Sequence, residues 1–212
     1  AANIGLGGVM ASIYGMVFIL ALYGENVLHW SASHLGFAGT VLPFSAAVGA
    51  GIGQTVVTRR GPREVTIFAA LGLIGGFVLL SGVGIHGDYL GRLLPAFALF
   101  GLALGAGATA FSIATLSGVH PNDAGLASGL NNTFESIFGA LGTAVLASIA
   151  LTRTNDLVHA GSAPLRALDS GFQLGFGVAI AFPVLSLFAA LALSRVRRPA
   201  LSTVPTPEPA LD

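Results

Sequence analysis

The chain has 212 residues, of which 54% are hydrophobic and only 8% are charged, and its mean hydropathy is +0.84. Soluble domains carry about 25% charged residues, so this composition excludes an ordinary soluble domain and predicts an integral membrane protein. The formal net charge of zero argues against a nucleic-acid partner. No residue of the chain is Cys, which excludes disulfides, thiol nucleophiles and thiolate metal sites.

Six apolar stretches are long enough to cross a bilayer, which takes about 20 helical residues. They cover 4–23, 35–57, 65–85, 93–116, 125–151 and 171–193. Connections are expected at 24–34, 58–64, 86–92, 117–123 and 152–170. We therefore predict an all-α integral membrane protein, with a six-helix transmembrane bundle over 1–198. A Pro-, Ser- and Thr-rich tail over 199–212 is predicted to be disordered.

The placement of arginine predicts the orientation of the bundle. One side collects Arg59, Arg60, Arg63, Arg195, Arg197 and Arg198, and the other side collects Arg92, Arg153 and Arg166. Basic loops favour the cytoplasm, so both termini are expected to be cytoplasmic in a bacterial plasma membrane. The chain begins at Ala1 without a basic leader or a cleavage site, and we expect it to be part of a longer protein.

Small residues recur at helix-packing spacing along these stretches. Pairs four apart are Gly49/Gly53, Gly72/Gly76, Gly101/Gly105, Gly125/Gly129 and Gly171/Gly175. Without a Cβ the helix backbones can approach closely, so these pairs predict packing rather than ligand binding. Pro43, Pro95 and Pro183 lie in or at the edge of spans, where they predict kinks.

The fifth stretch carries the most distinctive pattern. Asn122 or Asp123 can cap its start. At 100° per residue, one face then collects small and polar residues, namely Ser128, Asn131, Asn132, Glu135, Gly139 and Gly142. The opposite face collects Leu130, Phe134, Ile137 and Leu141. Such a helix is expected to face lipid on one side and a cavity or another helix on the other.

Glu135 is expected to be the only ionisable side chain deep in a span, about 18 Å from the helix start. An apolar span favours the neutral form of a carboxyl group, which makes proton uptake near neutral pH feasible. We hypothesise that Glu135 carries a proton or meets a cationic substrate. The alternative is a carboxyl that is hydrogen-bonded to Asn131 or to a neighbouring helix and serves packing only.

Three other groups of residues are weaker candidates. Asn131, Asn132 and Tyr14 could line a substrate cavity, or could simply pack and join helices. The loop 59–63, with Arg59, Arg60, Gly61 and Arg63, could anchor the topology on anionic lipid or act as a gate. No His-x-x-His or Glu-x-x-His spacing occurs, so no metal site is predicted.

A family resemblance is carried by several motifs in the second half of the chain. They are Leu116-Ser117-Gly118-Val119, Asp123-Ala124-Gly125-Leu126-Ala127-Ser128-Gly129-Leu130, Asn132-Thr133 and Gly139-Ala140-Leu141-Gly142. Together they resemble the C-terminal six-helix half of a major facilitator superfamily transporter, most of all the fourteen-helix drug:proton antiporters. The resemblance implies half of a proton-coupled exporter working by alternating access. Its implied partners are the lipid bilayer, a small lipophilic substrate and a missing N-terminal half, with a proton gradient in place of a cofactor.

Two departures from the family pattern concern the candidate sites. The loop 59–63 resembles the family's D-R-x-G-x-R gating loop, to which Asp123 would also contribute, but Thr58 stands where an Asp is common. After Asn132-Thr133 the family often has Arg-Gln, whereas this chain has Glu135-Ser136. The charge is therefore reversed at that place, and the family's usual role for it does not carry over.

One other function class fits the sequence poorly, and two others remain as alternatives. An intramembrane serine enzyme would need a base beside its nucleophile, and no predicted span contains a His or Lys. A transporter-derived fragment with only a structural or assembly role remains an alternative for these 212 residues. A symporter or facilitator of the same fold is a further alternative, and differs from an exporter only in its energetics.

Overall fold

The computed structural model describes residues 2–85, 87–116 and 124–192, and within these ranges it contains helices and no strand. The helices are α1 (Ala2–Asn26), α2 (Ala32–Gly39), α3 (Val41–Arg60), α4 (Pro62–Ser81), the π-helical turn η1 (Tyr89–Leu93), α5 (Leu94–Leu116), α6 (Ala124–His159), α7 (Pro164–Ala179) and α8 (Ala181–Ala192). Six stretches of them are long and apolar enough to cross a membrane. The predicted all-α architecture with six spans is therefore confirmed.

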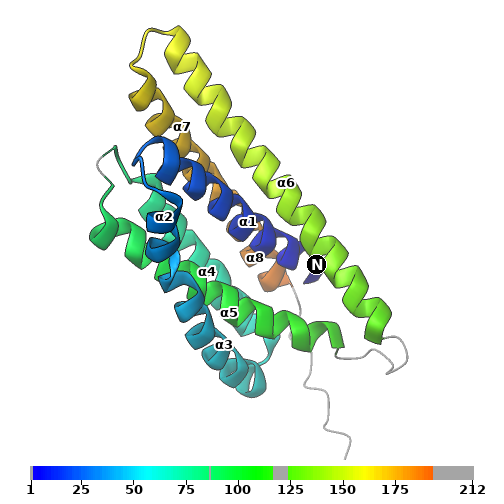
Figure 1. Ribbon diagram of the computed structural model, residues 1–212. Helices are drawn as coiled ribbons and strands as arrows, with labels where there is room; N and C mark the ends of the chain where they lie inside the picture. Colours follow the sequence, from blue (N-terminus) through cyan, green and yellow to red (C-terminus); the bar gives the residue numbers. More distant parts are fainter. Residues whose placement is uncertain (1, 86, 117–123, 193–212) are drawn as a thin grey trace, which may run out of the picture.

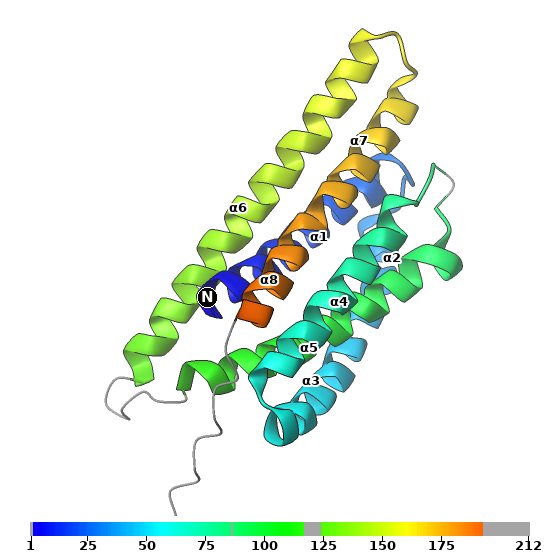
Figure 2. The ribbon, with the colours of Figure 1, turned by 180° about the vertical axis from the view of Figure 1, so that it is seen from behind.

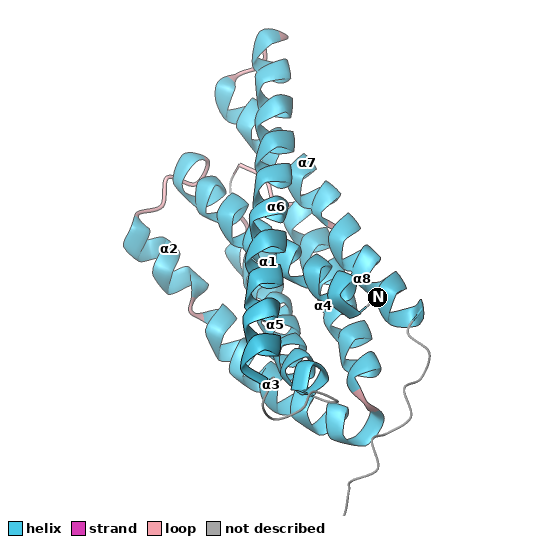
Figure 3. Cartoon of the chain, turned by 90° about the vertical axis from the view of Figure 1, so that its right-hand side faces the viewer, coloured by secondary structure: helices cyan, strands magenta, loops and turns pink. Residues whose placement is uncertain are grey.

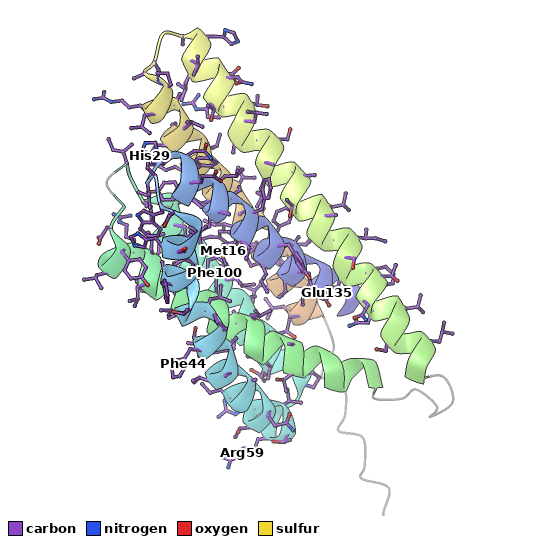
Figure 4. All side chains as sticks on the ribbon, in the orientation of Figure 1. Met16, His29, Phe44, Arg59, Phe100 and Glu135 are labelled. Carbon is purple, nitrogen blue, oxygen red and sulfur yellow. The ribbon has the colours of Figure 1, made fainter. Side chains whose placement is uncertain are left out.

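The helices run up and down between two ends of an elongated bundle (Figures 1 and 2). One end carries the turn between α6 and α7, and we call it the hairpin end. The other carries the turn between α3 and α4 with its arginines, and we call it the basic end. Figure 4 shows His29 near the hairpin end and Arg59 at the basic end, with Met16 and Phe100 between them.

Two of the six spans are interrupted where a proline removes a backbone hydrogen bond. Pro43 lacks the N–H that would bond the carbonyl of Gly39, and α2 ends at Gly39. In the same way Pro183 lacks the N–H for the carbonyl of Ala179, where α7 ends. The π-helical turn at 89–93 likewise precedes Pro95. The predicted interruptions are confirmed at Pro43 and Pro183, whereas near Pro95 the π-helical turn η1 runs directly into α5.

The predicted connection 152–170 is wrong. Helix α6 continues to His159 and α7 already begins at Pro164, so the turn between them covers only 160–163. The polar residues of this segment indicated a loop, but a helix can leave an apolar layer and continue with polar residues. Gly161, at φ +86°, and Pro164, at the first position of α7, form the tight turn. Figure 1 shows the resulting hairpin extending beyond the other helices.

The core lies around α1, because 72% of the apolar membrane-spanning stretch of this helix is buried inside the molecule. The side chains of Met16, Phe77, Phe100 and Phe176 are almost fully buried there, and the rings of Phe77 and Phe100 meet edge to face at 4.9 Å. By contrast, only 17% of the span that contains α3 and 22% of the α6 span are buried. Seen from the side in Figure 3, α6 covers α1, with α2 and α3 on one flank and α7 and α8 on the other. Two spans thus keep broad faces open.

Four of the five predicted glycine pairs lie at close helix contacts. A Cβ on Gly53 would meet the Ala106 backbone at 2.7 Å, and one on Gly76 would meet the Phe100 ring at 2.7 Å. Gly101 and Gly105 press on α3, while Gly171 and Gly175 press on α6 and α1. The exception is Gly125/Gly129, where a Cβ would meet nothing within 4 Å. This end of α6 has no neighbour at these glycines among the described residues, so the packing interpretation of that pair stays a prediction.

Candidate functional site

The structure brings together two residues that the sequence analysis singled out separately. Tyr14 is the central residue of α1, with twelve helical residues on each side. Its hydroxyl donates a hydrogen bond to Oε1 of Glu135 on α6, with an oxygen–oxygen distance of 3.3 Å. This bond is longer than the roughly 2.7 Å typical of O–H···O pairs. Figure 4 shows Glu135 between α6 and α1.

Glycines on α6 create the contact that allows this pair to form. Gly142 lies so close to α1 that an added Cβ would stand 2.5 Å from the carbonyl oxygen of Ala11. The ring of Tyr14 packs directly on Gly139, one turn after Glu135, since a Cβ on Gly139 would stand 2.9 Å from Cδ2 of that ring. The small face predicted for α6 therefore packs on α1, and the Tyr14–Glu135 pair lies at its margin.

The pair is open to its surroundings rather than sealed in the core. Tyr14 is 48% exposed and Glu135 is half-buried. Asn131 is also half-buried and Asn132 is exposed on the same side of α6. The opposite face of α6 exposes the apolar residues that were predicted for it, namely Leu130, Phe134, Ile137 and Leu141. The arrangement can therefore present a carboxyl, a phenol and two amides to a ligand beside an apolar surface.

The hydrogen-bond partner of the Glu135 carboxyl comes from a neighbouring helix. The packing alternative named Asn131 or a neighbouring helix as this partner, and the structure provides Tyr14 of α1. The role of Glu135 as a proton or cation site stays a prediction. Because the donor is a hydroxyl and not a cation, the carboxyl keeps the capacity to bind a proton or a positive charge.

At the basic end, the predicted gating loop is divided between two surroundings. Arg59 and Arg60 form the exposed last turn of α3, and Gly61, at φ +97°, turns the chain into α4. Arg63 points elsewhere, since its Nε donates to the carbonyl oxygen of Ala190 on α8 at 3.1 Å. This bond satisfies a carbonyl in the last turn of a helix. Asp123, the remaining member of the predicted loop, lies outside the described residues.

A groove of about 300 Å³ lies between α3 and α4 and reaches Ala106 of α5. Its walls are apolar except for Arg60 and Glu64. No residue of α1 or α6 lines it, so this groove is separate from the Tyr14–Glu135 pair.

A second polar cluster, at the hairpin end, was missed by the sequence analysis. Gln173 of α7 donates from Nε2 to Oδ2 of Asp169 at 3.0 Å and to the carbonyl oxygen of Val83 at 2.8 Å. Tyr23 of α1 donates to the adjacent carbonyl oxygen of Gly84 at 2.6 Å. Asp169 was placed in a connection, whereas it lies in the apolar span Pro164–Leu191. Asp169 lies near the start of this span, so the expectation that Glu135 is the only ionisable side chain deep in a span stays a prediction. The spacing of Asp169 and Gln173, one helical turn apart, was the available signal.

Comparison with known proteins identifies the family. The profile of the Major Facilitator Superfamily matches residues 3–143. The puromycin resistance protein of Streptomyces alboniger is 32% identical over 186 residues, which cover 85% of this chain and 37% of that protein. The cephamycin export protein of Amycolatopsis lactamdurans is 33% identical over 140 residues, covering 65% of this chain and 29% of that protein.

A multidrug resistance protein B homolog of Mycobacterium tuberculosis is 24% identical over 180 residues, which cover 84% of this chain and 33% of that protein. The chain thus spans about a third of the length of the curated relatives it matches. Its six long apolar helices agree with the membrane-spanning architecture of a transporter. The family profile covers most of the chain, and together with the relative from Streptomyces it shows that this chain belongs to the Major Facilitator Superfamily.

Proposed function

We propose that this chain forms one six-helix half of a bacterial plasma-membrane exporter for small lipophilic compounds. The matched relatives from Streptomyces and Amycolatopsis are described as a resistance protein and an export protein. The similarity covers most of this chain, including the helices that carry the Tyr14–Glu135 pair. We further propose that a proton gradient drives export by alternating access, and that the basic end faces the cytoplasm, since Arg59, Arg60 and Arg63 cluster there.

The single observation that carries the proposal is the Tyr14–Glu135 pair at mid-length of α1. A proton and a cationic substrate would compete for the same carboxyl oxygens. Binding one would favour release of the other, which is what exchange across a membrane requires. The Tyr14 hydroxyl orients the carboxyl without neutralising it, and Asn131 and Asn132 supply amides on the same side of α6.

The open faces of α3 and α6 support a second half as the partner. Their spans are the least buried of the six, at 17% and 22%. In transporters built from repeats, the substrate site lies near the bilayer midplane between the halves. A second six-helix bundle placed against α6 would enclose the Tyr14–Glu135 pair on its open side.

The experiment uses the complete gene that encodes this chain, expressed in bacteria from which everted membrane vesicles are prepared. Ethidium movement is followed by fluorescence with and without an imposed pH gradient. We expect Glu135→Gln, which keeps the shape and removes titration, to reduce pH-driven ethidium movement at least tenfold. The control Glu25→Gln changes an exposed carboxyl at the end of α1 and should leave the rate unchanged. Full pH-driven transport by the Glu135→Gln protein would disprove the proton role.

The sequence of the DNA upstream of Ala1 tests the proposed partner half. A reading frame that continues into further spanning helices supports one exporter chain with two halves. If no second half is encoded with this chain and the vesicles show no transport, the chain has a structural or assembly role. Ethidium counterflow that does not respond to the pH gradient would instead indicate a facilitator.

A further inference from the structure

The polar cluster at the hairpin end ties three helices together. Helix α4 ends at Ser81, and the two carbonyls of Val83 and Gly84 follow its end. The first accepts a hydrogen bond from Gln173 of α7 and the second from Tyr23 of α1. Tyr23 is 1% exposed. At Tyr23 the cluster therefore reaches into the hydrophobic core.

Asp169 is the ionisable member of this cluster, and it is incompletely paired. Its Oδ2 accepts from Gln173. Its Oδ1 is buried and has no hydrogen-bond partner in the described part of the chain. Burial of an oxygen without a hydrogen-bond partner disfavours the ionised carboxylate more than it disfavours the neutral acid. The geometry therefore favours a carboxyl that holds a proton.

The charged and titratable groups on the surrounding elements do not change this balance. On α1 the facing group is the phenol of Tyr23, which is neutral and already donates to Gly84. The charged residues of α4 lie at the basic end, and Arg92 of η1 packs on Gly82. The other charged residues near this end are exposed, namely Glu25, Asp88, Arg153, Asp156 and Arg166, and so is His29. Neither oxygen of Asp169 is bonded to a cation among the residues described.

We propose that Asp169 is a second proton-binding group at the hairpin end, held neutral because its Oδ1 is buried without a hydrogen-bond partner among the described residues. It is distinct from Glu135, because Tyr23 lies nine residues, or roughly 13 Å, further along α1 than Tyr14. With its proton, Asp169 keeps the Gln173 amide on Val83. Without the proton, the buried charge draws water into the cluster, so the contact between α7 and the end of α4 weakens as the pH rises.

This inference does not depend on transport activity, and it is tested without a transport assay. The full-length protein is reconstituted in phospholipid bilayers, and its infrared spectrum is recorded at pH 7 in the carbonyl-stretch region of protonated carboxyl groups. We expect Asp169→Asn to remove one protonated-carboxyl band that the wild-type protein shows. The control Asp156→Asn changes an exposed carboxyl of the same hairpin and should leave every such band in place.

A second variant guards against misfolding of the first. Asp169→Glu keeps a carboxyl and should shift the band rather than remove it. Glu135→Gln should leave this band unchanged, which separates the two proton sites. The proposal is overturned if Asp169→Asn and Asp169→Glu both leave the protonated-carboxyl bands of the wild type unaltered, or if Glu135→Gln alone accounts for them.

Discussion

Two helix contacts in this molecule use glycine in the same way and differ in what surrounds the glycine. Between α3 and α5, a Cβ on Gly49 would stand 2.7 Å from the Cα atom of Leu102, and Gly105 presses on the backbone at Ala46. Between α1 and α6, Gly142 presses on Ala11 in the same manner. At both contacts the two helix backbones lie so close together that there is no room for a Cβ atom on the glycine.

The difference lies in the polar side chains beside these glycines. At the α3–α5 contact, Ser45 bonds to the carbonyl of Val41 within α3. Thr109 bonds to the carbonyl of Gly105 within α5 and, at 3.5 Å, to the carbonyl of Ala50 on α3, so every acceptor at this contact is a backbone carbonyl. At the α1–α6 contact, Tyr14 and Glu135 bond to each other across two helices. Glycine spacing therefore predicts close approach, but not function. A candidate site arises only where polar side chains meet across the contact.

The largest effect is expected from a substitution that disrupts the α3–α5 contact. Gly105→Leu places a side chain on the carbonyl oxygen of Ala46 and the amide nitrogen of Ala50, which are backbone atoms and cannot rotate away. We expect a loss of about 3 kcal/mol or more in stability, measured by thermal unfolding in detergent with circular dichroism. Gly51→Leu on α3, where a Cβ meets open space, is the control. Equal melting of the two variants would refute the packing role of Gly105.

The α1–α6 contact can be altered without breaking it. Gly139→Ala pushes the exposed ring of Tyr14 outwards, whereas Gly129→Ala on the same helix meets nothing within 4 Å. Both changes gain the same helix propensity. We therefore expect Gly139→Ala to be about 1–2 kcal/mol less stable than Gly129→Ala. If Gly139→Ala acts through Tyr14, adding Tyr14→Phe to it should cost nothing further in ethidium transport; additive losses would contradict this.

The basic end offers a contact that depends on a single side chain. Arg63→Ala removes the donor to the carbonyl of Ala190 and should destabilise the end of α8 by about 1 kcal/mol. Faster hydrogen exchange in α8 would report this loss. Arg60→Ala, which removes an exposed side chain from the end of α3, serves as the comparison. Similar exchange in both variants would mean that the Arg63 bond does not hold α8.

The smallest expected effect concerns the hydroxyl of Tyr14. Tyr14→Phe removes one interhelical hydrogen bond, worth about 0.6 kcal/mol in a membrane protein, or about threefold in an equilibrium constant. We expect a change of that size in the ethidium concentration at half-maximal transport. Tyr89→Phe removes a hydroxyl bond to Ala38 away from the Tyr14–Glu135 pair and should leave transport unaltered. The hydroxyl has no role in substrate binding if both variants behave alike.

Much of the candidate site could be named from the sequence, but its connections could not. Glu135 and Tyr14 were each conspicuous because a polar group stands in an apolar stretch. Their pairing joins residues 121 positions apart, and no local pattern encodes such a distance. Asp169 was assigned to a loop because the segment around it is polar, and polar composition alone does not distinguish a loop from the first turns of a helix.

The sequence by itself determined the class of this protein, its six spans and the kinks at Pro43 and Pro183. These depend on local chemistry, since apolar length sets a span and a missing N–H interrupts a helix. The tertiary structure was needed to show that Glu135 meets Tyr14, that Arg63 donates to Ala190 and that Asp169 pairs with Gln173. Each of these results depends on how helices cross, and crossing geometry is set by packing between side chains that are distant in the sequence.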